Sequence, residues 1–143
     1  MLPSRITLAA IVLFIPRYQC LTSDDSPFTL TSKGTGLCII KKSSRCLDVR
    51  WTTGDRLFII MTRKCLGAQG KTLGSEVSSY DCDDKSELQK WECKNETLLA
   101  LKGQQLYIEM KADETLSLSR TVGPNNHLTV TGSNRGACSR TYR

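Results

Sequence analysis

The sequence is poor in the residues from which most catalytic and metal sites are built. His127 is the single histidine among 143 residues, and no two cysteines form a C-x-x-C pair. Zinc sites usually draw on closely spaced cysteine and histidine pairs, and hydrolase, zincin and phosphate-loop motifs are missing. We therefore predict that the protein is not an enzyme and holds no metal and no cofactor.

Carboxylates gather in only one place, and their spacing matches no calcium loop. Because lysines stand among these acids, at Lys85 and Lys90, we interpret the cluster as a salt-bridged surface. Its members are Asp81, Asp83, Asp84 and Glu87.

Long hydrophobic runs are also missing, apart from one near the N-terminus. Ile6 to Ile15 is ten residues long, about 15 Å as a helix, which is roughly half a bilayer core. A basic residue before it and polar residues after it are typical of a signal peptide. We predict a signal peptide over 1–23, with cleavage after Ser23 or Cys20, and a secreted domain over 24–143 without a membrane span. If the chain is a piece of a receptor, the domain is its extracellular part.

The charge is mildly basic and dispersed. Loss of Arg5 and Arg17 with the leader lowers the formal net charge from +6 to 6 − 2 = +4. Nucleic-acid binders carry a denser basic stripe, so nucleic acid is excluded. The densest basic stretch is KKSSR, 41–45, which fits either a solvated loop or a contact with an anionic glycan.

The cysteine count becomes even once the leader, with Cys20, is removed. Six cysteines in an oxidising compartment predict three disulfides. Six cysteines allow fifteen pairings, and spacing alone does not choose among them. The six are Cys38, Cys46, Cys65, Cys82, Cys93 and Cys138.

Hydrophobic periodicity predicts strands almost throughout. Apolar and polar residues alternate, or nearly so, at 106–110, 116–119 and 128–131, and short apolar runs stand at 57–60 and 98–101. Turn signals separate these segments. Only 86–89 suggests a helix, and it has room for a single turn.

Two tryptophans mark an internal repeat. Trp51 and Trp91 are forty residues apart, each is followed by a short apolar strand, and Leu128 lies thirty-seven residues further on. Three units of about forty residues cannot each bury a hydrophobic face alone, but they can around a pseudo-threefold axis. The sequence thus predicts an all-β, disulfide-stapled β-trefoil, a closed arrangement with few exposed strand edges.

Four stretches carry a family resemblance: QKW at 89–91, the run CDDKSELQKWECKNETLLALKG at 82–103, KCLG at 64–67 and the terminal ACSRTYR. They resemble the ricin-B-type cysteine-rich domain at the N-terminus of the mannose receptor family, most closely that of the macrophage mannose receptor. The resemblance implies a ricin-B lectin-like trefoil of an endocytic receptor that binds sulfated galactose-type glycans. It also implies disulfides between successive cysteines, Cys38–Cys46, Cys65–Cys82 and Cys93–Cys138.

The tryptophans are interpreted as core residues because they recur at equivalent points of two repeats. A buried indole also needs a partner for its N–H, and Gln89 is suited to local hydrogen bonding near Trp91. CLDV at 46–49 resembles the opening of a ricin-B repeat, which would suit Asp48 to a galactose pocket. If Cys46 closes the first disulfide, that likeness is accidental.

The resemblance places the glycan site in the loop of the third repeat. The stacking tryptophan of the family falls on Asn125, while its basic residue is retained as Arg120. We predict glycan or glycoprotein binding by a loop that has lost its aromatic platform, or, alternatively, a non-lectin scaffold or protein-interaction domain. The candidate residues are Arg120, Thr121, Asn125, Asn126 and His127. N-E-T at 95–97 is the single N-x-S/T sequon and predicts glycosylation of Asn95.

Overall fold

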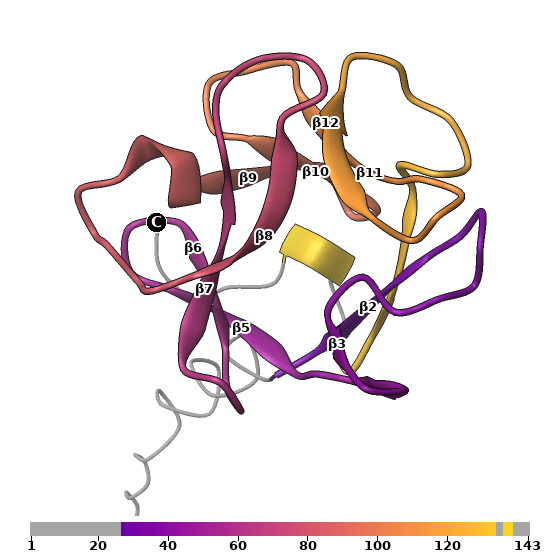
Figure 1. Ribbon diagram of the computed structural model, residues 1–143. Coiled ribbons are helices and arrows are strands. Elements are labelled where there is room, and N and C mark those ends of the chain that lie inside the picture. Colours follow the sequence, from indigo (N-terminus) through magenta and orange to yellow (C-terminus); the bar gives the residue numbers. More distant parts are fainter. Residues whose placement is uncertain (1–26, 134–135, 139–143) are drawn as a thin grey trace, which may run out of the picture.

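The computed structural model describes residues 27–133 and 136–138, and within these ranges the chain is built from short strands (Figure 1). The two helical segments there are single 3-10 turns, η2 (Glu87–Gln89) and η3 (Gly136–Cys138). Neither could cross a membrane. The strands are β2 (Thr29–Ser32), β3 (Lys41–Lys42), β4 (Arg45–Cys46), β5 (Val49–Thr52), β6 (Arg56–Ile59), β7 (Lys64–Ala68), β8 (Glu76–Tyr80), β9 (Trp91–Asn95), β10 (Leu98–Leu101), β11 (Tyr107–Met110), β12 (Leu116–Ser119) and β13 (Leu128–Thr131).

The predicted strand segments and the predicted helical turn at 86–89 are present, whereas η3 was not predicted. At the helical turn, the side chain of Ser86 accepts a hydrogen bond from the backbone N–H of Leu88 and so caps η2. In β12 the alternation of apolar and polar residues was misleading, because Ser117 and Ser119 are buried along with Leu116 and Leu118. Residues 1–23, predicted as a signal peptide, and the end of the ACSRTYR motif lie outside the described residues.

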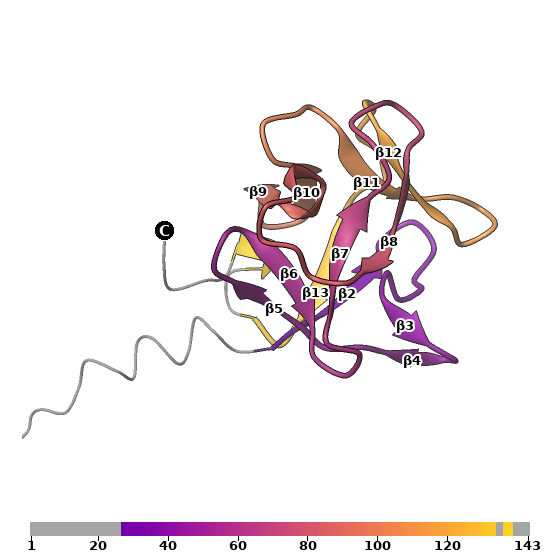
Figure 2. The ribbon, with the colours of Figure 1, turned by 60° about the vertical axis from the view of Figure 1, so that its left-hand side comes forward.

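The sheet is antiparallel and winds through all three repeats. Its main part has the order β5-β6-β7-β8-β12-β11-β10-β9. The last strand, β13, pairs with β2 at the start of the domain, and an isolated bridge between Phe28 and Val49 ties that pair to β5. The two views in Figures 1 and 2 show the resulting closed arrangement, with the first and last strands side by side.

The repetition predicted from the tryptophans is present in the backbone. The N–H of Trp91 donates to the carbonyl of Asp55, in the turn between β5 and β6, at 2.8 Å. The N–H of Leu128 donates to Thr97, in the turn between β9 and β10, also at 2.8 Å. Each bond joins the first residue of a strand to the first hairpin of the preceding repeat, so equivalent contacts recur one repeat apart.

Both tryptophans belong to the hydrophobic core, as predicted. Trp91 is 0% exposed and Trp51 2%. The indole of Trp91 donates to the carbonyl of Leu66 at 2.9 Å, and that of Trp51 donates to Ala137 at 2.8 Å. Each ring therefore joins strands that are distant in sequence, and neither offers a face to a ligand.

All three predicted disulfides are present, Cys38–Cys46, Cys65–Cys82 and Cys93–Cys138. The likeness of CLDV at 46–49 to a ricin-B opening is therefore accidental, since Cys46 closes the first bridge. Each bridge removes conformational entropy from the unfolded chain, more for the longer loops.

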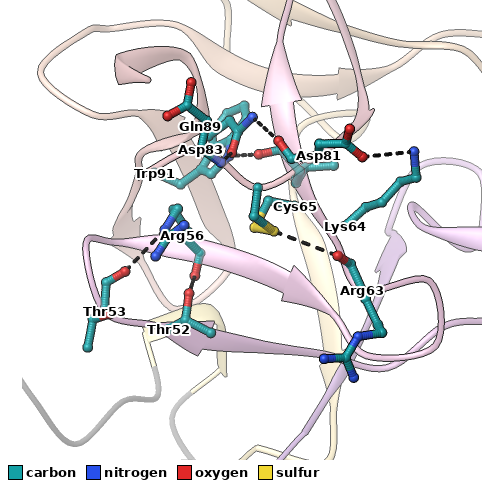
Figure 3. Close-up of a disulfide and its surroundings, with 12 residues drawn as sticks. Thr52, Thr53, Arg56, Arg63, Lys64, Cys65, Asp81, Asp83, Gln89 and Trp91 are labelled. Atoms are coloured by element: carbon teal, nitrogen blue, oxygen red, sulfur yellow. Dashed lines mark hydrogen bonds and ion pairs between the residues drawn. A yellow bond between two sulfur atoms is a disulfide. The ribbon is translucent and has the colours of Figure 1, made fainter. Parts of the chain in front are cut away.

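Gln89 forms hydrogen bonds to residues close to it in sequence, as predicted, while the indole of Trp91 bonds Leu66 instead. It is the last residue of η2, and its amide group bonds the backbone of Asp81 and Asp83 (Figure 3). Its Nε2 donates to the carbonyl of Asp81 at 2.9 Å, and its Oε1 accepts from the N–H of Asp83 at 2.9 Å. The buried amide thus holds the chain on both sides of the second disulfide.

The acidic cluster is a salt-bridged surface, but with other partners than those expected. Lys64 pairs with Asp81 at 3.4 Å, and Lys71 pairs with Glu87 at 2.5 Å. The partners come from β7 and the turn after it because the β7–β8 hairpin packs beside η2, which sequence proximity alone did not indicate.

Candidate glycan-binding loop

The third-repeat loop, defined here as residues 120–127, connects β12 to β13. Its first turn is formed by short hydroxyl side chains at the end of β12. The Oγ of Ser119 lies 2.9 Å from the Oγ1 of Thr121 and accepts the N–H of Thr121 at 3.2 Å. Such side-chain contacts to a nearby backbone favour turns over continued strand pairing, so the chain leaves the sheet here and exposes Arg120.

Asn126 is the residue that organises the loop. It is 2% exposed; its Oδ1 accepts the N–H of Gly123 at 2.9 Å, and its Nδ2 donates to the carbonyl of Ile108 at 3.2 Å. The sequence prediction counted Asn126 among the ligand donors, but both ends of its amide group are engaged within the fold. Its role is to position the loop on β11.

Asn125 lies at the surface and joins the loop to the first repeat. Its backbone carbonyl accepts the N–H of Met110 at 3.1 Å. Its side chain lies over Gly34, where an added Cβ would meet Oδ1 at only 2.1 Å. The lack of a side chain at Gly34 therefore permits the present position of Asn125.

His127 is half-buried and faces the second repeat. Its Nδ1 lies 2.9 Å from the Oγ1 of Thr97, and its backbone carbonyl accepts the N–H of Lys33 at 2.9 Å. Thr97 also bonds the side chain of Asn95 through its N–H and its hydroxyl, at 2.9 and 3.0 Å. The exposed sequon thus lies next to the third-repeat loop, a proximity that the sequence did not indicate.

The outer surface of the loop is polar with one cation. Arg120, Thr121 and Asn125 are exposed, and Arg120 forms no ion pair with any residue that the structure describes. Val122, which sequence reasoning overlooked, is 48% exposed. The loop therefore offers a guanidinium, a hydroxyl, an amide and a small apolar contact, but no aromatic face.

No cluster of histidine, cysteine and acidic side chains suitable for a metal ion occurs in residues 27–133 and 136–138. The side chains that the loop exposes can form hydrogen bonds and charge pairs. A guanidinium can bind a sulfate or carboxylate through two parallel hydrogen bonds.

Comparison with known proteins assigns the chain to a family. The model of the MRC2-like, N-terminal cysteine-rich domain matches residues 13–139. The chain belongs to this family of mannose receptor cysteine-rich domains. It is a family of receptor domains and not of enzymes, and the three disulfides agree with an extracellular location.

Two further similarities support the family and the fold. The secretory phospholipase A2 receptor of Bos taurus is 28% identical over 102 residues, which are 71% of this chain and 6% of that receptor. The designed threefold-symmetric protein ThreeFoil matches with a TM-score of 0.53 and 12% identity, over 73% of this chain and 96% of its own. The second similarity concerns the fold alone and confirms the predicted β-trefoil.

Proposed function

We propose that this cysteine-rich domain is an extracellular recognition module that binds sulfated galactose-type glycans through its third-repeat loop. The observation that carries the proposal is the pairing of a rigid loop base with an exposed cation. Asn126 fixes the loop on β11 through two hydrogen bonds, and Arg120 projects outside it without an ion-pair partner among the described residues. A loop held in this way loses little conformational entropy when it binds.

The proposed roles follow from the position of each side chain. The guanidinium of Arg120 binds the sulfate through two parallel hydrogen bonds. Thr121 and Asn125 form hydrogen bonds with the sugar hydroxyls. Val122 supplies a small apolar contact with the sugar ring. His127 stays on the inner side of the loop with Thr97, where its ring nitrogen supports the loop.

Binding through such a loop is expected to be weak and salt-sensitive. Without an aromatic ring at Asn125, the loss of apolar contact costs on the order of 1 to 3 kcal/mol, or roughly 5- to 150-fold in affinity. The remaining attraction comes mainly from one exposed charge, which added salt screens.

A glycan array tests the proposal. It compares the secreted chain with an Arg120→Ala variant and an Asn125→Trp variant. We expect weak signals on sulfated galactose-type glycans that Arg120→Ala abolishes and Asn125→Trp strengthens. Tight binding of a neutral glycan that neither variant changes would refute the assignment.

The missing aromatic ring favours a second candidate function, a scaffold or protein-interaction domain without a sugar site. In that case the array shows no sulfated-glycan signal for the secreted chain, and Asn125→Trp does not create one. The family relationship is compatible with both functions, because fold does not determine function.

A further inference from the structure

A second concave surface lies where the three repeats meet, and it shares no residue with the third-repeat loop. The inter-repeat cavity, as we name it, has a volume of about 320 Å³ and opens to solvent between β3, residues 76–79 of β8 and the turn before β12. Figure 2 shows the C-terminal end of β8 near β3. The cavity is at the small end of the range for ligand sites. Its apolar lining is aliphatic: Ile39, Ile40, Leu47, Ile59, Leu66, Val77 and Leu116.

One side of this cavity is a strand edge that the sheet leaves open. β8 pairs with β7 from Val77 to Tyr80, but β12 pairs with β8 only at Glu76 and Val77. The N–H of Gln69 donates to the carbonyl of Glu76. The backbone N–H and C=O of Glu76 therefore point toward β7. Because this direction alternates along an antiparallel strand, Ser79 directs its N–H and C=O away from β7. No described hydrogen bond uses these two groups on that side.

The rim of the cavity carries charges of both signs. Lys41 and Glu114 form an ion pair at 2.5 Å that links the first and third repeats. The other two charged residues, Lys42 and Glu76, form no ion pair with the residues that the structure describes. Hydroxyl groups complete the rim, at Thr62, Ser78, Ser79 and Thr115.

We propose that the inter-repeat cavity binds an extended peptide segment of a partner protein. The segment forms a β-bridge with the backbone of Ser79, as in other cases where a peptide adds to a sheet edge. One aliphatic side chain enters the cavity. Flanking residues place an acidic group on Lys42 and a basic group on Glu76.

The observations favour a peptide over a glycan or a lipid. A sugar ring packs best on an aromatic face, whereas the lining has only aliphatic side chains. A lipid tail would use the apolar lining but not the open backbone groups of Ser79. An extended peptide uses the lining, the strand edge and both charges, which is why we commit to it.

Selection from a phage-displayed library of random dodecapeptides, with the secreted chain as bait, tests the proposal. We expect the selected peptides to share an aliphatic residue with an acidic residue nearby.

Fluorescence polarisation of one such labelled peptide then measures its affinity for the unchanged chain and for three variants. Ser79→Pro removes the outward N–H but no bond to β7, and proline is tolerated at such edges. Lys42→Glu reverses the charge on the rim. Arg45→Glu is the matched control, because Arg45 is opposite Lys42 in the β3–β4 pair but does not line the cavity.

We expect Ser79→Pro and Lys42→Glu each to weaken the peptide at least tenfold, and Arg45→Glu to change its affinity less than twofold. If Ser79→Pro does not fold, as judged by thermal melting, Thr115→Trp replaces it, because a large side chain there closes the cavity from the third repeat. Failure to select a peptide, or affinity that these variants leave unchanged, would overturn the proposal. Binding of heparin or of anionic lipid vesicles that depends on Lys42 but not on Ser79 would also overturn it. The glycan array is independent, since none of these residues belongs to the third-repeat loop.

Discussion

Replacement of Trp91 by phenylalanine tests whether this ring supports the fold. The indole is 0% exposed, and its N–H donates to the carbonyl of Leu66 across the core. The β6–β7 pairing covers only Lys64 and Cys65 of β7, so the indole satisfies a carbonyl just beyond the ladder. Phenylalanine keeps an aromatic ring but cannot donate a hydrogen bond.

Two contributions determine how much Trp91→Phe lowers the free energy of unfolding. A buried carbonyl left without a donor costs about 1 to 3 kcal/mol. The smaller ring loses apolar burial and leaves a gap, which costs on the order of 1 kcal/mol more. The sum of roughly 2 to 4 kcal/mol is a large part of the 5 to 15 kcal/mol that typical domains have. At roughly 3 to 6 °C per kcal/mol for this size, Tm should fall by about 6 to 24 °C.

Thermal and urea unfolding of the disulfide-intact protein measure the change. Leu73→Ala is the control, because Leu73 is 61% exposed and its loss should leave the free energy of unfolding within about 0.5 kcal/mol of the original. An unchanged Tm in Trp91→Phe, together with lost glycan binding, would mean that the ring contacts a ligand, and the core assignment would be wrong.

Three further predictions concern the loop, the sequon and an acid group. Asn126→Ala should lower the free energy of unfolding by about 2 kcal/mol, because it leaves buried backbone groups unpaired. Urea denaturation measures this, and a free energy of unfolding equal to that of Asn125→Ala would contradict it. Asn95 should carry an N-glycan when the chain is secreted from a eukaryotic cell, so peptide-N-glycosidase should reduce the mass, and an unchanged mass would refute it. The Lys94 ammonium, followed by the N–H of Gly103, holds the pKa of Glu92 below its ordinary value. Glu92 therefore contributes stability above its unfolded-state pKa and loses it as pH falls through the lower folded-state pKa. Glu92→Gln should make the free energy of unfolding depend less on pH in the acidic range. An unchanged pH dependence would argue against this role of Glu92.

The fold was predictable because its signals are local or repeated. Periodicity marked the strands, and the spacing of Trp51 and Trp91 marked the repeat. Residue spacing left the disulfide pairing open, and only the family resemblance at 82–103 indicated it. The structure then confirmed that pairing.

The site was predictable only in part, because side-chain roles depend on contacts between repeats. Nothing local distinguishes Asn125, which is exposed, from Asn126, whose amide is buried against β11. Gln89 likewise found its partners in the segment around Cys82, which is near in sequence but folded back by η2. The open edge at Ser79 follows from where the β8–β12 pairing stops, and that register cannot be read from either strand alone.

The central claim is that the third-repeat loop recognises a sulfated glycan, and an NMR titration tests it most directly. Amide signals of the isotope-labelled secreted chain are followed while sulfated N-acetylgalactosamine is added. We expect saturable shifts confined to residues 119–127 and their neighbours around Thr97, and we expect Arg120→Ala to abolish them. Shifts centred on another repeat, or none at millimolar sugar, would contradict it.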